Sequence, residues 1–196
     1  MAGSRMKALL NLNKELMIKV NHRFSNHKID HQTETMIIGT FNPETAENDA
    51  DFFYGRSRNF FWRLLPIAYG EADLKRSTRQ EKINFIQKYN IGLIDLIEEV
   101  QVEDGQEANY YDRYIDRKVT RWKDIVGIMK NLPNLKKVCF TRRISSDIPS
   151  MRTQLEPIRQ YCEKNGIPFI SLTTPARYYN EHKQAEWTQV FSNDTR

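Results

Sequence analysis

Residues 36–43, Met-Ile-Ile-Gly-Thr-Phe-Asn-Pro, decide the fold of this chain. The apolar run Met36–Gly39 predicts a short buried strand, and the Asn-Pro pair that follows predicts a turn. Three later apolar runs are similar in length and character, which is typical of strands buried on both faces. These runs are residues 92–97, 137–141 and 168–172.

Helical patterns separate the four strands. They are residues 59–65 ended by Pro66, a helix opened by a capping box at 77–80, a helix capped by Thr120, residues 150–165 ended by Gly166, and residues 181–191. Alternating strands and helices predict an α/β protein, a three-layer α/β/α fold with a central, mostly parallel four-stranded sheet. The acidic stretch 98–116 reads as a polar loop.

We expect one domain over residues 1–196, because the length suits one core and no linker stands out. Residues 1–30 are expected to be an N-terminal helical extension packed on that domain. Its apolar side chains recur at three- and four-residue steps, as on one helical face. They are Leu9, Leu12, Leu16, Val20 and Phe24.

The composition narrows the class of protein. Hydrophobic residues make up 39% and charged residues 28% of the chain, which indicates a globular protein. The two cysteines and four histidines have no metal-ligand spacing, so we expect no metal and no cofactor. No run is long enough to span a membrane, and the low number of cysteines suits the reducing cytosol, so we expect a cytoplasmic protein. We also expect a monomer, nucleoid-associated if prokaryotic. The net charge of +5 is compatible with a polyanionic partner.

Ligands of open parallel sheets bind outside the carboxyl ends of the strands, which directs attention to three loops, residues 40–58, 141–143 and 173–180. The first and the third are unusual in composition. Residues 40–58 combine an amide at a strand end, an aromatic pair before Gly55, and two arginines. Residues 173–180 combine a stiff Pro turn with large side chains after it. An aromatic ring in such a loop can stack on a nucleobase, and arginines can neutralise phosphates. The bland alternative is that these rings are core and these arginines are solvated.

These two loops resemble the motifs of the uracil-DNA glycosylase superfamily, and are most similar to its mismatch-specific uracil/thymine and deoxyinosine (hypoxanthine) branches. In that superfamily a strand ends in Asn-Pro or Asp-Pro, an aromatic turn and an Asn-x-Phe-Trp helix start follow, and a Ser/Thr-Pro turn comes after the last strand. The matching positions here are Asn42-Pro43, Tyr54-Gly55, Asn59-Phe60-Phe61-Trp62 and Thr174-Pro175-Ala176. The likeness spans roughly residues 36–187.

The resemblance implies a glycosylase-like fold and a monofunctional DNA base-excision repair enzyme that flips a deaminated base, uracil or hypoxanthine, out of DNA. A positioned water then hydrolyses the N-glycosidic bond, and the partner is damaged double- or single-stranded DNA. It implies the following roles: Asn42 as the catalytic, water-positioning residue; Phe41, Pro43, Tyr54, Asn59 and Thr174 in substrate binding; Arg56, Arg58, Arg177 and Tyr178 in DNA binding. Neither motif holds a lysine, so strand cleavage is not expected.

Three departures from the motifs shape these expectations. One extra residue separates Gly39 from Asn42, Glu44 replaces a small residue, and the second motif has no His. Fast, general removal of uracil is therefore not expected. A second hypothesis is a member of the same superfamily that binds nucleic acid without cleaving it. A third, a domain for another phosphorylated ligand, lacks a glycine-rich phosphate loop.

Overall fold

The computed structural model describes residues 16–143 and 146–192, and its centre is a four-stranded parallel sheet. The strand order is β3-β2-β6-β7, and every neighbouring pair is parallel. The strands are β2 (Thr35–Gly39), β3 (Ile91–Asp95), β6 (Lys137–Phe140) and β7 (Phe169–Ser171). The predicted mostly parallel sheet is confirmed, with each strand inside its expected apolar run or within one residue of it.

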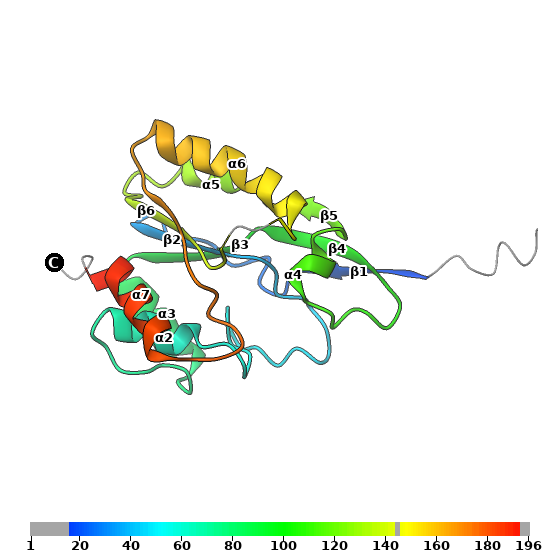
Figure 1. Ribbon diagram of the computed structural model, residues 1–196, viewed down its shortest axis with the longest axis horizontal. Coiled ribbons are helices and arrows are strands. Elements are labelled where there is room, and N and C mark those ends of the chain that lie inside the picture. The colour runs from blue at the N-terminus through cyan, green and yellow to red at the C-terminus, as the bar shows by residue number, and fades with distance from the viewer. Residues whose placement is uncertain (1–15, 144–145, 193–196) are drawn as a thin grey trace, which may run out of the picture.

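Helices cover both faces of this sheet, so the molecule has three layers (Figure 1). One face carries α5 (Ile125–Met129) and α6 (Pro149–Lys164); the other carries α2 (Phe61–Ala68), α3 (Arg79–Lys88) and α7 (Glu181–Phe191). Alternation along β2 feeds both layers, since Met36 and Ile38 join one apolar cluster and Ile37 joins the other. The predicted three-layer α/β/α fold is confirmed.

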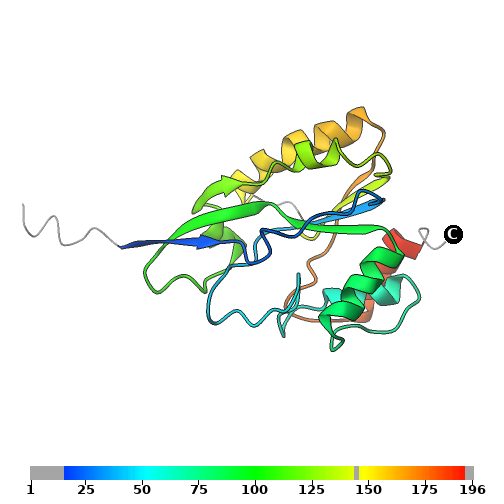
Figure 2. The same ribbon diagram turned by 180° about the vertical axis from the view of Figure 1, so that it is seen from behind.

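A second, antiparallel sheet of three strands, in the order β1-β4-β5, was not expected from the sequence. Its strands are β1 (Met17–Asn21), β4 (Ile97–Glu103) and β5 (Val119–Trp122). Figure 2 shows it extending from one end of the parallel sheet. This sheet pairs the N-terminal strand β1 with β4 at the start of the acidic stretch. Because β4 begins two residues after β3 ends, the pair lies next to the central sheet.

The expected N-terminal helix is wrong where the structure describes it. Residues 17–21 form β1, and they pair with β4 from Met17↔Glu103 to Asn21↔Glu99. Val20 is buried while its neighbours Lys19 and Asn21 are exposed, as a two-residue period requires. Tertiary pairing therefore overrides the helical spacing of the apolar side chains. The part of the expected helix before residue 16 lies outside the described residues.

Three other boundaries differ from expectation. The acidic stretch holds β4 and the short helix α4 (Asp112–Ile115), so it is no simple loop. Thr120 lies within β5, and α5 is capped instead by Asp124, whose Oδ1 accepts a hydrogen bond from Gly127 N at 2.8 Å. The capping box of α3 is confirmed one residue later than expected, between Thr78 and Glu81.

Pro66 was expected to end its helix, yet α2 continues through it to Ala68. A helical proline leaves the carbonyl four residues earlier without its N–H donor. That carbonyl belongs to Trp62, and it accepts a hydrogen bond from Leu74 N at 2.8 Å instead. Because the loop supplies the missing donor, the proline is tolerated.

Candidate active site

The site is built at the carboxyl ends of β2 and β3, and we call the surface formed there by Gly39, Asp95 and Tyr54 the floor of the site. Gly39 is paired with Asp95, the last residue of β3. A Cβ on Gly39 would lie 2.1 Å from Asp95 Oδ1 and 2.6 Å from Tyr54 Oη. Glycine is therefore required here, because the carboxylate and the phenol occupy the space that a side chain would take.

Asp95 is held by a buried histidine. Its Oδ2 lies 2.7 Å from His22 Nε2, and both side chains are almost fully inaccessible. Phe24 N donates to His22 Nδ1 at 3.1 Å, so the ring proton is on Nε2 and is donated to the carboxylate. No hydrogen bond from the described residues reaches Asp95 Oδ1, the carboxylate oxygen that lies beside Gly39.

Sequence reasoning missed both members of this pair. A signal was present for Asp95, since a carboxylate ends an otherwise apolar buried strand and would have to find a donor. For His22 there was none, because the residue lay in a segment expected to be helical.

Asn42 is buried, and its amide is fixed in orientation. Asn48 Nδ2 donates to Asn42 Oδ1 at 2.5 Å and to the Pro43 carbonyl at 2.6 Å. Asn48 Oδ1 accepts from Arg56 Nε at 3.3 Å and from Ala50 N at 3.2 Å. These partners fix which atom of each amide is the oxygen. Asn48 binds the oxygen of the Asn42 amide, and the Nδ2 group of Asn42 has no acceptor among the described residues. The sequence did not single out Asn48.

Tyr54 turns from the first loop back onto the floor. It has a left-handed backbone with φ of +58°, which is costly for a residue with a side chain. One face of its ring stacks on Phe61 with centroids 4.0 Å apart, so only the other face can meet a ligand. Its Oη lies 3.2 Å from Thr141 Oγ1, and the Thr141 hydroxyl donates to the Ile38 carbonyl. Burial raises the pKa of the Tyr54 phenol, and the charge of Asp95 raises it further.

The two loops singled out in the sequence are joined directly. Asn59 and Ala176 form an antiparallel bridge, flanked by hydrogen bonds from Phe60 N to the Pro175 carbonyl and from Arg177 N to the Arg58 carbonyl, both at 2.9 Å. The expected neighbourhood of the loops is therefore present in the structure.

Lys183 fixes the second loop from below. Its side chain is buried, and Nζ donates to the carbonyls of Tyr178 at 2.7 Å and Ala176 at 3.3 Å. Burial lowers the pKa of its ammonium group. Between these two carbonyls Arg177 adopts a left-handed φ of +77°, and its side chain and that of Tyr178 are exposed. Lys183 therefore holds a strained turn that presents two large side chains to solvent.

The remaining predicted residues lie around the floor in different settings. Asn59 Oδ1 accepts from Phe61 N at 3.0 Å, so this oxygen serves the start of α2. The Phe41 ring centroid is 5.9 Å from that of His22, and the buried Pro43 forms an isolated bridge with His22. Thr174 Oγ1 accepts from Ala176 N within its own turn.

The two arginines of the first loop differ. Arg58 is exposed, whereas Arg56 is half-buried with its guanidinium 3.7 Å above the Tyr110 ring. Burial lowers the pKa of Arg56, while the nearby Tyr110 and Asp49 act in the opposite direction.

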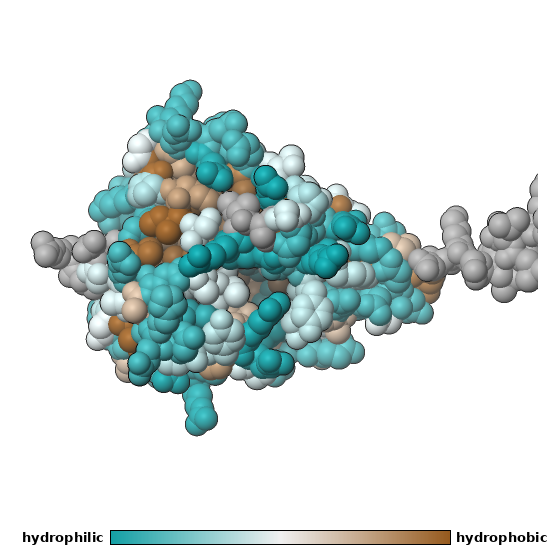
Figure 3. Space-filling model, in the orientation of Figure 1, coloured by the Kyte–Doolittle hydropathy of each residue, from teal (hydrophilic) through white to brown (hydrophobic). Residues whose placement is uncertain are grey.

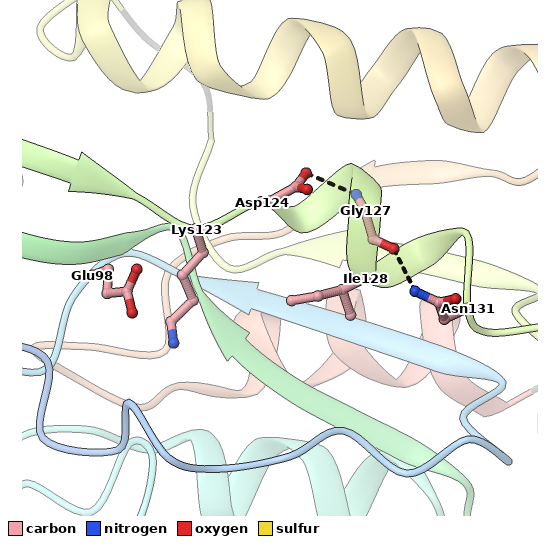
Figure 4. Close-up of a pocket in the computed structure, with 6 residues that line it drawn as sticks. All are labelled: Glu98, Lys123, Asp124, Gly127, Ile128 and Asn131. Carbon is pink, nitrogen blue, oxygen red and sulfur yellow. Dashed lines mark hydrogen bonds between the residues drawn. The ribbon is translucent and has the colours of Figure 1, made fainter.

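Figure 3 shows a hollow near the middle of one face of the molecule, with strongly hydrophilic side chains at its edge. Another hollow, of about 460 Å³, lies beside α5 and is lined by Glu98, Lys123, Asp124, Gly127, Ile128 and Asn131 (Figure 4). Its polar groups are largely engaged in the helix, since Gly127 N donates to Asp124 and the Gly127 carbonyl accepts from Asn131 Nδ2. We assign it no role.

Within residues 16–143 and 146–192, no group of three or more metal-binding side chains converges. No helix in that part of the chain is both long and apolar enough to cross a membrane.

Comparison with known proteins adds relatives of similar length. No model of a known protein family matches the chain. It is 30% identical over 164 residues to a protein of Methanosarcina barkeri called hypoxanthine DNA glycosylase, covering 83% of this chain and 93% of the relative. A protein of the same name from Methanosarcina acetivorans is 25% identical over 163 residues, with the same coverage of both chains.

One solved structure is similar in fold. It is the solution structure of a candidate uracil DNA glycosylase from Methanosarcina acetivorans, with a TM-score of 0.60 and 24% identity. The match covers 86% of this chain and 94% of that protein.

Proposed function

Since the chain belongs to the uracil-DNA glycosylase superfamily, beside relatives called hypoxanthine DNA glycosylases, we propose that it is a DNA glycosylase that removes a deaminated base from DNA. The bond broken is the N-glycosidic bond between base and deoxyribose, and water supplies the hydroxyl that replaces the base. Hypoxanthine is the first substrate to test, because the relatives carry that name.

One observation carries the choice of a deaminated base: the floor of the site presents acceptors. The Thr141 hydroxyl donates to the Ile38 carbonyl, so the hydrogen bond between Tyr54 and Thr141 is donated by Tyr54. The oxygen of Tyr54 and the free Oδ1 of Asp95 then offer lone pairs at the same place, beside Gly39. Two acceptors side by side require a donor from the ligand.

Deamination creates such a donor. The ring nitrogen N1 of adenine and N3 of cytosine are acceptors, whereas hypoxanthine N1 and uracil N3 carry a hydrogen. A carboxylate at this edge therefore favours the deaminated base and repels the normal one. A site built to hydrogen-bond one N–H group can discriminate strongly against a base that lacks it.

Asn42 is proposed to position the attacking water. Cleavage builds positive charge on the sugar, and this charge attracts the attacking water. The water must therefore be positioned, but a strong base is not essential. The Asn42 amide can donate from Nδ2 to the water oxygen and accept through the second lone pair of Oδ1. Because Asn48 fixes this amide, the water is oriented before the substrate arrives, which lowers the entropic part of the barrier.

The proposed DNA contacts follow from exposure. Arg58 and Arg177 are exposed and lie opposite each other, one on each of the two joined loops, where phosphates can approach. Tyr178 is 57% exposed next to Arg177, and we propose that it enters the space left by the flipped nucleotide. Lys183 is occupied by two carbonyls, which supports a water-using, monofunctional reaction.

The test is release of the base from labelled oligonucleotides, single- and double-stranded, that carry hypoxanthine, uracil, xanthine or a thymine mismatch. Abasic sites are then cleaved with alkali. We expect release of hypoxanthine, retention of DNA binding in Asn42→Ala, and loss of release in that variant. Release of none of the four bases by the wild-type protein would exclude the glycosylase.

The alternative is a member that binds nucleic acid without cleaving it. It is favoured by the hydrogen bond that already occupies Asn42 Oδ1 and by the absence of a His from the second loop. Tight, salt-dependent DNA binding without base release would support this alternative.

A further inference from the structure

Two adjacent tyrosines stand exposed at the end of the acidic loop between β4 and α4. Tyr110 is 51% exposed and Tyr111 is 68% exposed, although aromatic rings are costly to leave in water. Their ring centroids are 6.3 Å apart and the ring planes differ by 28°, so the two rings face a similar direction. No residue of the proposed chemistry requires them to be there.

The pair is attached to the proposed active site. Arg56 lies 3.7 Å from the Tyr110 ring centre, and its Nε donates to Asn48, the residue that fixes Asn42. Figures 1 and 2 show from opposite sides that the loop after β4 comes close to the segment after β2. Arg56 and Asn48 therefore link Tyr110 to the amide of Asn42, which is proposed to hold the water.

The backbone that carries the rings is also held in place. Tyr111 is the N-cap residue of α4, and its carbonyl accepts from Tyr114 N and Ile115 N at 2.8 and 3.0 Å. The next residue, Asp112, forms an ion pair with Arg142. A ring on such an anchored turn loses little conformational entropy when it binds.

We propose that Tyr110 and Tyr111 form a stacking platform for an unpaired nucleobase that flanks the excised one in the same strand. The inference rests on the proposed function. Arg56 covers part of Tyr110, so Tyr111 offers the freer ring. The loop also carries Asp104 and Glu107, which form no ion pair with the described residues. The stacked, exposed rings themselves favour the flat face of a neutral base as the occupant.

This platform selects DNA whose flanking base is not stacked in a duplex. Stacking of a base on an aromatic side chain tolerates any sequence, because every base has a π-face. The proposal therefore predicts that the affinity for single-stranded or locally melted DNA depends more strongly on Tyr111 than the affinity for fully paired DNA does.

The experiment uses the full chain and a single-stranded oligonucleotide with a tetrahydrofuran abasic analogue flanked by 2-aminopurine. Binding of wild-type protein is expected to change 2-aminopurine fluorescence. Tyr111→Ala is expected to abolish that change and to weaken binding roughly 5- to 100-fold. Tyr111→Phe keeps the ring and is the matched control, expected to bind as the wild type does, and Tyr111→Leu tests whether apolar area alone suffices.

Equal affinity and fluorescence in Tyr111→Ala and wild type would overturn the platform. So would an equal loss of affinity for an oligonucleotide whose flanking positions have no bases. Because the 2-aminopurine oligonucleotide carries an abasic analogue in place of the excised base, there is no base to release, and the readout is independent of catalysis. A Tyr111-dependent signal in a protein that releases no base would refute the glycosylase and keep the platform.

Discussion

The Nε2 atom of His22 lies 2.7 Å from Oδ2 of Asp95, although the two residues are 73 positions apart. The contact uses one oxygen of the carboxylate and leaves the other at Gly39, beside Tyr54. A buried carboxylate is retained at a cost unless it is hydrogen-bonded, and His22 supplies that hydrogen bond. The pair thus keeps an acceptor in the floor of the proposed base pocket.

Replacing Asp95 by Asn is expected to reverse the polarity of that floor. The His22 N–H would take the amide oxygen, which leaves the amide NH2 group facing the substrate N–H. We expect kcat/KM for hypoxanthine release to fall roughly 10- to 100-fold. Asp104→Asn removes an exposed carboxylate of the same type and is the control. Unchanged release by a folded Asp95→Asn protein would contradict the role of Asp95 in reading the base.

Replacing His22 by Phe is expected to destabilise the fold, because it orphans a buried charge. The free energy of unfolding should fall by about 3 kcal/mol in denaturant titration. In an Asp95→Asn background the same change should cost less, since no charge is left without a partner. If the two costs add without coupling, the hydrogen bond seen here does not stabilise the protein.

Asn48→Ala is expected to release the amide of Asn42 from its fixed orientation. Single-turnover base release should slow roughly 10- to 100-fold while the affinity for DNA changes little. The control is Asn26→Ala, an exposed amide with no hydrogen bond to the described side chains. A loss of affinity at an unchanged rate would place Asn48 in DNA binding instead.

Lys183→Met is expected to loosen the turn that presents Arg177. The variant keeps the length of the side chain but gives up two hydrogen bonds to carbonyls, so the free energy of unfolding should fall by about 1–3 kcal/mol. DNA affinity should fall with it. Lys164→Met, at the exposed end of α6, should change neither quantity. A stable variant with normal DNA affinity would show that the turn holds itself.

The acid side of the stability curve should depend on Glu103. Hydrogen bonds from Lys118 and Tyr114 lower the pKa of this carboxyl from 4.5 to about 2. A lowered folded pKa stabilises the fold above the unfolded value, and this stabilisation is lost as the pH falls from 4.5 towards 2.

Thermal unfolding of Glu103→Gln tests this linkage. The wild type should be the more stable protein above pH 5, and the difference should shrink between pH 4.5 and pH 2. Glu107→Gln is the control from the same loop. A difference that stays constant across this window would refute the linkage.

The sequence by itself determined the central sheet and the position of the two loops. Apolar runs such as Met36–Gly39 are local signals, because a strand buried on both faces must be apolar whatever it packs against. The Asn-Pro and Thr-Pro turns after such runs then fall at the carboxyl edge by topology alone. The structure joins them through the Asn59–Ala176 bridge.

Other features could not be predicted from local pattern. The apolar spacing around Val20 fits a helix, yet β4 offers that segment a strand partner, and paired backbone groups outweigh a weak propensity. The helix through Pro66 depends likewise on a donor from Leu74, in a separate loop.

The floor of the site was decided only by tertiary structure. The partners His22 and Asp95, and the contact of Arg56 with Tyr110, join segments that no periodicity relates. Side-chain hydrogen bonds and ring contacts act over a few ångströms, so they exist only after the sheet has brought distant segments together. Sequence patterns report which backbone is buried, whereas the chemistry of this pocket depends on which buried polar atoms meet.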